Sequence, residues 1–416
     1  MKILALNCGS SSIKFVLYDW KSKISLVKGL IERIGEKDSV IKYESGAGVE
    51  KKETTAVKDH LQGVQSIISI ITNPENNLIS SINDISAIAH RVVHGADKFA
   101  SSVIIDDNVL QVIKDVASLA PLHNPPNIVG IEAAKATLST IPHIAVFDTA
   151  FHQTIPDYAY IYPLPYEWYT KYKVRRYGFH GTSHLYVSKR AAVILGKHPS
   201  ETNVITMHIG NGVSITAVKN GVSVDTSMGL TPLEGAMMGT RSGNIDPAII
   251  SYIMQKENLT EAEVEKILNK KSGILGITGK YSDRRDVVKY ASEGDYLCQL
   301  AIEMETYRLK KRIGSYSAVL GRVDAVVFTA GVGENSPIIR EKTCDGLDFL
   351  GMKFDKAKNN LVDMVKKEEV ISMDDSKVKI LVIPTNEEIV MIEDAVALIE
   401  GYYDDHLHMT YSFQKK

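Results

Sequence analysis

The chain has 416 residues, of which 44% are hydrophobic and 24% are charged, and its formal net charge is -2 at pH 7. This length exceeds one ordinary hydrophobic core and predicts two or three domains, and the balanced charge argues against a nucleic-acid-binding surface. No apolar run is long enough to span a bilayer, and the start of the sequence lacks the features of a secretory signal, so we expect a cytoplasmic protein without a membrane partner. Three widely spaced cysteines, Cys8, Cys298 and Cys344, indicate buried thiols and neither a disulfide framework nor a zinc site.

The chain begins with two β-rich runs that meet at a turn of glycine and serine, within residues 3–18. Glycine lets the main chain approach an anion, so the amides of such a turn can bind a phosphate group. The hydroxyl groups of Ser10 and Ser12 and the ammonium group of Lys14 would add donors. When this turn is considered alone, a plain hairpin with a glycine bend is the favoured interpretation.

The following part of the chain alternates β-like and helical patterns. The β-like runs are residues 85–89 and 143–147, and the helical patterns are residues 108–120 and 128–138. This order favours an α/β architecture. Two polar segments are predicted to be surface loops: residues 45–58 and 197–203.

A second hairpin of the same design is predicted within residues 204–218, and another short strand follows the turn at 219–221. Its central turn contains Gly210, Asn211 and Gly212, and His208 precedes it. Two such hairpins about two hundred residues apart predict two homologous domains that face each other across a cleft. The pairing favours a phosphate-binding role for both turns.

The familiar nucleotide-binding motifs are missing. Residues 276–281 have the wrong spacing for a P-loop, and no glycine pair completes the GxGxxG pattern, so a P-loop or Rossmann protein is disfavoured. Residues 329–336 are interpreted as a strand-to-loop turn whose small residues leave room for a flat adenine. Residues 379–383 predict a strand, and residues 389–403 predict an amphipathic helix that packs on the first domain.

Several blocks of the sequence resemble the acetate kinase family, in the same order along the whole chain. They are residues 7–14, 89–95, 120–125, 146–152, 176–183, 225–243 and 384–388. Two positions depart from the usual pattern: Asn244 replaces the usual Asp, and Asp97 replaces the usual Glu.

The resemblance implies the α/β fold of the sugar-kinase, Hsp70 and actin superfamily, with duplicated ribonuclease-H-like domains and an active-site cleft between them. The expected first domain is residues 1–149 completed by the C-terminal helix within 388–416, and the second domain, with the nucleotide-binding elements, is residues 150–387. A homodimer is also implied.

The resemblance assigns catalytic roles to Arg91, Asp148, His180 and Arg241. A planar, permanently charged guanidinium suits the carboxylate of the acid and the transferring phosphoryl group, so Arg91 and Arg241 are expected to hold them, with His180 as a donor to the transition state. A short fatty acid resembles a Glu side chain, with a pKa near 4.3, and is already ionised at neutral pH. We therefore hypothesise that Asp148 orients Arg91, Arg241 or a metal-bound water and removes no proton.

The resemblance also implies the binding residues. The acid is expected to contact Arg91 and an apolar pocket of Val93, Leu122, Phe179 and Pro232. Mg²⁺, for which Mn²⁺ can substitute, is expected on Asn7 and Glu387. ATP is expected to contact Ser10, Ser12, Lys14, His208, Ile209, Gly210, Asn211, Gly212, Asp283, Arg284, Arg285, Gly331, Val332, Gly333, Glu334 and Asn335.

These expectations predict an ATP-dependent kinase that converts acetate to acetyl phosphate and ADP, reversibly and by direct in-line transfer. A propionate or butyrate kinase of the same family is the first alternative, because one methylene in an apolar pocket changes specificity by only about 1 to 3 kcal/mol. A non-catalytic, nucleotide-gated binding module is the second. A zinc hydrolase is poorly supported, because His90 and His94 lack the Glu of an HExxH motif.

Overall fold

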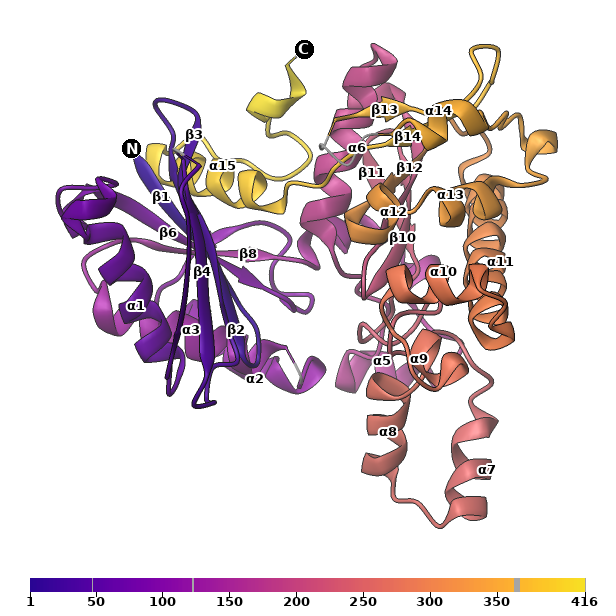
Figure 1. Cartoon of the computed structure of the whole chain (residues 1–416), viewed down its shortest axis with the longest axis horizontal. Coiled ribbons are helices and arrows are strands. Elements are labelled where there is room, and N and C mark those ends of the chain that lie inside the picture. Colours follow the sequence, from indigo (N-terminus) through magenta and orange to yellow (C-terminus); the bar gives the residue numbers. More distant parts are fainter. Residues whose placement is uncertain (47, 122, 363–366, 416) are drawn as a thin grey trace. The chain divides into compact units, whose positions relative to one another are not determined.

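The computed structural model describes residues 1–46, 48–121, 123–362 and 367–415. The chain forms two compact units (Figure 1). Unit 1 comprises Met1–Phe151 and Asn386–Ser412, and unit 2 comprises His152–Thr385 and Phe413–Lys416. The end of the chain differs from the expectation that 388–416 belongs wholly to the first domain. The main-chain carbonyl of Phe413 accepts a hydrogen bond from Arg190, and the Phe413 ring packs on Tyr186 of unit 2.

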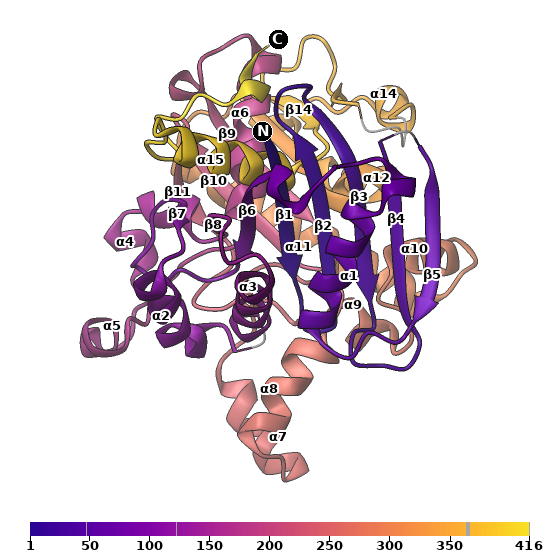
Figure 2. The same cartoon turned by 90° about the vertical axis from the view of Figure 1, so that its left-hand side faces the viewer.

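Unit 1 is built on an eight-stranded sheet with the order β5-β4-β3-β2-β1-β6-β8-β7 (Figure 2). Its strands are β1 (Lys2–Cys8), β2 (Ser12–Asp19), β3 (Ile24–Glu32), β4 (Ser39–Ser45), β5 (Glu50–Thr55), β6 (Ile85–Val92), β7 (Val103–Ile104) and β8 (His143–Phe147). Strands β1 to β5 pair antiparallel in succession, and β6 and β8 continue the sheet parallel to β1. The first predicted hairpin is thus confirmed.

Strand β5 corrects the prediction that residues 45–58 form a surface loop. Its residues are exposed on both faces except for the last, which is half-buried, and it is the outermost strand of the sheet. An exposed edge strand has no apolar face, so hydrophobic alternation cannot reveal it.

Helices cover both faces of this sheet. They are α1 (His60–Thr72), α2 (Asp107–Asp115), α3 (Asn124–Thr137) and α15 (Glu387–Glu400), with short 3-10 turns at Pro74–Asn76, Ile82–Asp84 and Ala117–Leu119. Because strand side chains alternate between faces, Leu4 and Leu6 pack with α1 and α3, whereas Ile3 and Ala5 pack with α15. The prediction that the C-terminal helix packs on the first domain is confirmed.

Unit 2 contains a six-stranded sheet with the order β11-β10-β9-β12-β14-β13. Its strands are β9 (Asn203–Ile209), β10 (Val213–Lys219), β11 (Val222–Thr226), β12 (Ala325–Thr329), β13 (Glu369–Val370) and β14 (Lys379–Val382). Strands β9 to β11 pair antiparallel, and β12 and β14 run parallel to β9. The second predicted hairpin, with the short strand after it, is confirmed.

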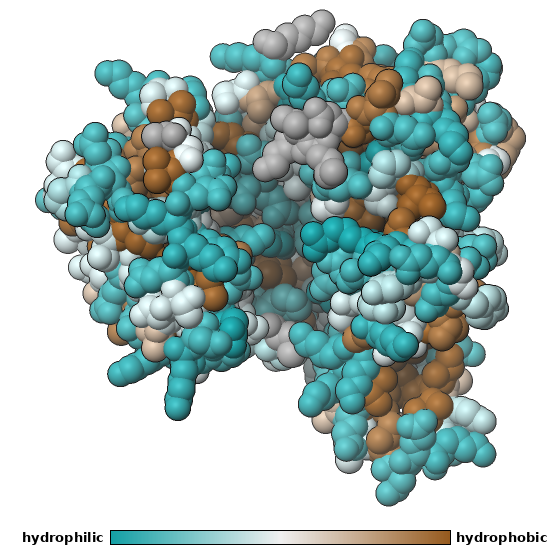
Figure 3. All heavy atoms as spheres, in the orientation of Figure 1, coloured by the Kyte–Doolittle hydropathy of each residue, from teal (hydrophilic) through white to brown (hydrophobic). Residues whose placement is uncertain are grey.

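The helices of unit 2 lie mostly in its long connections (Figure 1). They are α4 (Asp157–Tyr160), α5 (Tyr166–Tyr172), α6 (Gly181–Leu195), α7 (Ala248–Glu257), α8 (Glu261–Lys270), α9 (Gly273–Thr278), α10 (Arg284–Ser292), α11 (Tyr296–Leu320), α12 (Ala330–Asn335), α13 (Pro337–Cys344) and α14 (Lys356–Asn360). Further 3-10 turns are Ala150–Thr154, Pro199–Glu201, Asp348–Leu350 and Ser412–Gln414. Figure 3 shows apolar side chains on the surface of α7 and α8, where Ile249 is exposed.

Helix α12 corrects the interpretation of residues 329–336 as a strand-to-loop turn, because Ala330–Asn335 is helical. Its glycines concealed the helix, since glycine is the poorest helix former after proline. No described helix is long and apolar enough to cross a membrane.

The two sheets share one topology over six strands. The order β3-β2-β1-β6-β8-β7 in unit 1 corresponds to β11-β10-β9-β12-β14-β13 in unit 2. Each pair of neighbours has the same relative direction in both units, including the short antiparallel strand at the end. The molecule is therefore a duplicated α/β fold.

Candidate active site

The turn between β1 and β2 is fixed by contacts to two helices. The Gly9 amide donates to the Ser12 carbonyl at 2.8 Å. The Gly9 carbonyl accepts from His60 Nε2 at the start of α1 (2.7 Å), and the Cys8 carbonyl accepts from Asn127 Nδ2 of α3 (2.7 Å). These contacts hold the turn while Ser10 and the side chain of Lys14 stay exposed.

Strand alternation brings the predicted polar residues of unit 1 to one face of its sheet. Residues 3, 5, 87, 89, 144 and 146 pack against α15, so Asn7, Arg91 and Asp148 continue that face at the carboxyl ends of parallel strands β1, β6 and β8. Lys14 is the register partner of Asn7. Glu387 begins α15, which covers this face.

Arg91 and Asp148 form a bidentate ion pair. Arg91 Nε donates to Asp148 Oδ1 at 2.9 Å, and Nη2 donates to Oδ2 at 2.7 Å. Arg91 Nη1 lies 3.8 Å from Glu387 Oε2. The Asp148 side chain is 2% exposed. Burial alone would lower the pKa of Arg91, but Asp148 and Glu387 raise it above its usual value, so the guanidinium stays charged.

Two asparagines of α3 position the loop after β6, and sequence reasoning missed both. Asn127 Oδ1 accepts from the Val93 amide (3.0 Å), and Asn124 Oδ1 accepts from the His94 amide (3.0 Å). Asn127 thereby joins the Val93 loop to the end of β1. Of the predicted apolar pocket, Val93 lies in unit 1, Phe179 and Pro232 lie in unit 2, and Leu122 lies outside the described residues.

The turn between β9 and β10 is closed by the Gly210 amide, which donates to the Gly212 carbonyl at 2.9 Å. The carbonyl of Asn211 accepts from the Gly239 amide at 3.0 Å. A Cβ atom at Gly239 would lie 2.0 Å from Asn211 Oδ1, so only glycine allows this approach. Ile209 and His208, in the strand before the turn, are buried.

His180 lies beside this turn with left-handed backbone geometry (φ 58°), immediately before α6. Its ring stacks on that of His208 with centroids 4.1 Å apart. His208 Nδ1 is hydrogen-bonded to Ser183 Oγ at 2.8 Å. The neighbouring Phe179 is buried, and its carbonyl accepts from His152 Nε2 at 3.1 Å.

Arg241 lies next to the same turn. A Cβ atom at Gly212 would be 3.4 Å from His180 Nε2 and 3.5 Å from Arg241 Nη1. Arg241 Nη1 donates to the Pro232 carbonyl at 2.8 Å, and no acidic side chain in the described ranges forms an ion pair with it. Burial lowers the pKa of Arg241. A largely buried cation without a carboxylate partner is suited to bind an anion.

The residues predicted to contact ATP on α10 have unequal settings. Arg285 is 90% exposed and pairs with Asp283, whose pKa it lowers. Arg284 instead forms a buried ion pair with Glu305 of α11, with Nη2 and Oε1 2.8 Å apart. Contacts of Arg284 within the described chain therefore hold α10 on α11.

The predicted adenine residues lie on α12. Nothing lies within 4 Å of a Cβ atom built at Gly331, whereas Gly333 packs against the end of β12. Val332 is half-buried. Glu334 Oε1 accepts from the Thr385 amide at 3.0 Å, and Asn335 Nδ2 donates to the Gly331 carbonyl at 2.8 Å.

Arg340 of α13 supports this helix, and sequence reasoning missed it. Its Nη1 donates to the carbonyls of Gly333 (2.9 Å) and Glu334 (2.7 Å), and its Nε donates to Asn359 Oδ1 (2.7 Å). The side chain is fully buried, and burial lowers its pKa to about 10. A cation near the last carbonyls of a helix satisfies acceptors that have no intrahelical partner.

Comparisons with known proteins identify the family to which the chain belongs. The model of the Acetokinase family matches residues 2–393. Acetate kinases of Geobacter metallireducens and Geobacter sulfurreducens are 58% and 59% identical, and each alignment covers 100% of this chain and 99% of the relative. The crystal structure of Porphyromonas gingivalis acetate kinase is 43% identical with a TM-score of 0.90, covering 96% of this chain and 99% of that one. A propionate kinase from Francisella tularensis is also 43% identical, with a TM-score of 0.88 and coverage of 94% and 98%. The chain belongs to the acetokinase family.

Proposed function

We propose that this enzyme transfers the γ-phosphoryl group of ATP to a carboxylate oxygen of acetate, giving acetyl phosphate and ADP in one reversible in-line step. The observation that carries the proposal is the largely buried guanidinium of Arg241, which lies beside His180 and the Gly210–Gly212 turn with no acidic partner among the described residues. Such a setting favours an anion that gains charge during the reaction.

The contacts of Arg91 support a role in holding the acid. Asp148 occupies Nε and Nη2, whereas Nη1 is 3.8 Å from Glu387, beyond hydrogen-bonding distance. Asp148 therefore fixes the plane of the guanidinium and leaves Nη1 able to donate to a carboxylate. Since acetate is ionised at neutral pH, the reaction needs no general base, and the pairing supports Asp148 as an orienting residue.

During transfer, the phosphoryl group carries negative charge on its three equatorial oxygens. We assign Arg241 and His180 as the hydrogen-bond donors to these oxygens. Preorganised donors of this kind act without rearrangement during the reaction. The stacking of His180 on His208 and the bond of His208 to Ser183 favour a fixed imidazole.

Asn7 and Glu387 fit a magnesium ion chemically, because an amide oxygen and a carboxylate are hard oxygen ligands and Mg²⁺ retains several waters. Asn7 lies on the face of the unit 1 sheet that carries Arg91, and Glu387 begins helix α15, which covers that face. When bound, the ion supplies charge neutralisation for the phosphates of ATP.

The curated relatives favour acetate, since the acetate kinases of two Geobacter species are 58% and 59% identical. Propionate is the second candidate, because the Francisella propionate kinase and the Porphyromonas acetate kinase are equally identical to this chain at 43%. One extra methylene in an apolar substrate pocket changes specificity by about 1 to 3 kcal/mol, so we expect propionate to be used less well than acetate.

The test is hydroxamate trapping of acyl phosphate with acetate, propionate or butyrate, each with ATP or pyrophosphate and with or without Mg²⁺. We expect trapped product to decrease from acetate to butyrate and to require ATP and the metal. Absence of hydroxamate with every acid would refute the kinase, a preference for propionate would select the second candidate, and pyrophosphate-driven product would refute ATP as the donor. A homodimer and a cytoplasmic location stay predictions from the sequence.

A further inference from the structure

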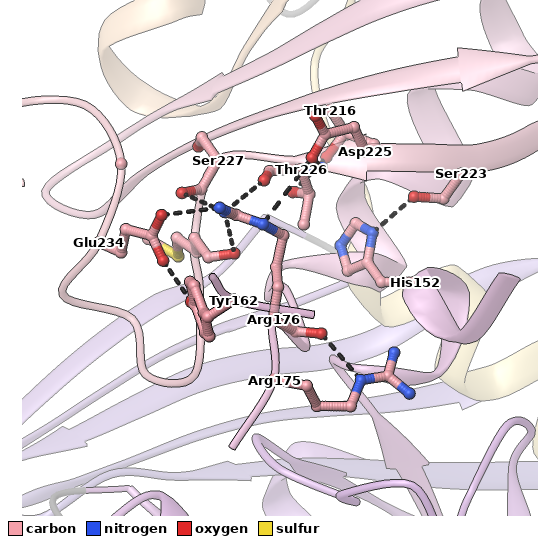
Figure 4. A network of polar contacts seen from close by, with 12 residues as sticks. His152, Tyr162, Arg175, Arg176, Thr216, Ser223, Asp225, Thr226, Ser227 and Glu234 are labelled. Carbon is pink, nitrogen blue, oxygen red and sulfur yellow. Dashed lines mark hydrogen bonds and ion pairs between the residues drawn. The ribbon is translucent and has the colours of Figure 1, made fainter. Parts of the chain in front are cut away.

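Unit 2 contains a network of polar contacts that includes Tyr162, Arg176 and Glu234 (Figure 4). Its centre is Arg176, whose side chain is 14% exposed. Arg176 Nη1 donates to the carbonyls of Thr226 (2.8 Å) and Ser227 (3.2 Å), and Nη2 donates to Glu234 Oε1 (2.7 Å). One guanidinium thus contacts both ends of residues 227–234, the segment called here the Pro232 loop.

Tyr162 also belongs to this network, because it binds the second carboxylate oxygen of Glu234. Its hydroxyl donates to Glu234 Oε2 and accepts from the Leu230 amide at 3.0 Å. Burial and the charge of Glu234 raise the pKa of Tyr162 above its usual value. The phenol therefore keeps its donor proton throughout the working pH range.

The Pro232 loop is closed so tightly that its middle requires glycine. A Cβ atom at Gly229 would lie 1.9 Å from Glu234 Oε2 and 2.1 Å from the Tyr162 hydroxyl. Beyond the loop, Asn244 Oδ1 accepts from the Gly235 amide at 2.6 Å. Aspartate has the same acceptor atom, so Asn244 can replace the usual Asp without loss of this hydrogen bond.

The Pro232 loop also supplies the carbonyl that accepts from Arg241 Nη1 at 2.8 Å. In the described ranges the other acceptor of this guanidinium is the sulfur of Met238, at 3.7 Å, which is a weak acceptor. An arginine without a carboxylate partner depends on such backbone contacts for its orientation. The geometry points to Arg176, Glu234 and Tyr162 as positioning residues that hold the Pro232 loop and thereby aim Arg241 at the transferring phosphoryl group, an inference that rests on the proposed function.

The first test removes one hydroxyl from the network. Tyr162→Phe keeps the ring but leaves Glu234 Oε2 and the Leu230 amide without the hydroxyl. We expect kcat for acetyl phosphate formation to fall about tenfold at every pH from 6 to 8, with an unchanged KM for ATP, because a lost hydrogen bond to a partly buried charged group has an effect of this size. The matched control is Tyr160→Phe, which removes a hydroxyl bonded to Tyr169 outside the Pro232 loop and is expected to keep wild-type kcat. Equal kcat values for Tyr162→Phe and Tyr160→Phe would overturn the inference.

The second test asks whether the effect passes through Arg241. In an Arg241→Lys background, Tyr162→Phe and Glu234→Gln should change kcat little, because the aimed guanidinium is already gone. If instead the loss in kcat caused by the network variant multiplied the loss caused by Arg241→Lys, the network would have a purely structural role, and the inference would be contradicted.

Crystal structures decide the claim without an activity measurement. We expect Arg241 Nη1 to move away from the Pro232 carbonyl in Tyr162→Phe and to stay in place in Tyr160→Phe. An unmoved Arg241 in both variants would refute positioning even if turnover falls. If the wild-type enzyme forms no acyl phosphate, the proposed function fails, and the crystal structures still test the positioning.

Discussion

The two units share a strand order but hold their arginines in opposite ways. In unit 1, Arg91 is bound by both oxygens of Asp148 and lies near Glu387. In unit 2, Arg241 is bound by a backbone carbonyl, with no acidic partner in the described part of the chain. Asp148 and Glu387 raise the pKa of their neighbour Arg91, whereas burial lowers the pKa of Arg241. The same strand order can thus hold one arginine in a fixed orientation by an ion pair, as for Arg91, and leave another without a neutralising carboxylate, as for Arg241.

The turns that accompany these arginines differ as well. The first turn carries the hydroxyls of Ser10 and Ser12, and its Gly9 carbonyl accepts a hydrogen bond from His60. The second turn carries Asn211, packed on the backbone of Gly239. The comparison predicts unequal consequences for stability and similar consequences for activity when either arginine is removed.

The largest expected effect is on stability, and it should be confined to Arg91. Arg91→Ala leaves the buried carboxylate of Asp148 without its cation and should lower the free energy of unfolding by about 3 to 5 kcal/mol. Arg241→Ala removes a cation that lacks an acidic partner and should have a much smaller effect. Urea unfolding measures both. The control is Arg91→Ala/Asp148→Ala, which should recover most of the loss, and equal destabilisation by the two single variants would contradict the comparison.

The next effect is on catalysis, where the two arginines should behave alike. Arg91→Ala and Arg241→Ala should each lower kcat by a factor of about 10² to 10³, because each removes a preorganised donor. The hydroxamate assay at saturating acetate and ATP measures this loss. Tyr160→Phe is the folded control with wild-type kcat, and near-normal turnover in either alanine variant would remove that arginine from the site.

The third effect is the pH dependence of stability, which is expected to arise from buried histidines in both units. Burial lowers the pKa of His90 and His143 in unit 1, and it lowers that of His152 in unit 2 to about 4. An unfolded histidine has a pKa of about 6.5, so between these values the unfolded state binds more protons and stability falls as pH falls. For His152 the difference amounts to about 3 kcal/mol between pH 6.5 and 4.

His152→Gln tests this sign, because an amide can still bond to Ser223 and to the Phe179 carbonyl but does not titrate. Urea unfolding at pH 7 and pH 5 should give a shallower loss of stability for the variant than for the wild type. An unchanged pH slope would show that His152 titrates alike in the folded and unfolded states.

The smallest effect of the four is expected for Asp148→Asn. The variant keeps one oxygen acceptor but loses the charge, so the transition-state stabilisation calculated from kcat/KM for acetate should fall by about 1.5 to 3 kcal/mol. The proposal that Asp148 orients Arg91 and removes no proton predicts that neither protein shows an ionisation between pH 6 and 8 in the direction of acetyl phosphate synthesis. A rate that rises with a single ionisation in the wild type and loses it in Asp148→Asn would identify Asp148 as a base.

Much of the fold could be predicted from local patterns. Both hairpins follow from alternating apolar runs around glycine turns, and α15 follows from its apolar face. Strand β5 and helix α12 could not be predicted, because β5 is exposed on both faces and α12 contains two glycines in six residues. In these two cases the neighbouring structure, and not the local pattern, decides the conformation.

The site could be predicted only where family motifs contain its residues. Arg91 and Asp148 are 57 positions apart, and their pairing follows from the parallel alignment of β6 and β8. The Arg284–Glu305 pair and the Arg340 contacts depend on helix packing, which no sequence spacing indicates. Arg176, Gly229 and Glu234 lie inside two of the family blocks, but their contacts with one another depend on the folded chain, in which Gly229 marks a close approach of side chains.

The most direct measurement follows the oxygen atoms of acetate. With acetate labelled by ¹⁸O in both carboxylate positions, we predict that every acetyl phosphate molecule carries ¹⁸O bonded to phosphorus, seen as an isotope shift in its ³¹P resonance. This outcome requires that a carboxylate oxygen of acetate attack a phosphorus atom, as we propose for an acid bound by Arg91 and a phosphoryl group bound by Arg241. An unshifted ³¹P resonance in the product would contradict attack by the carboxylate on phosphorus.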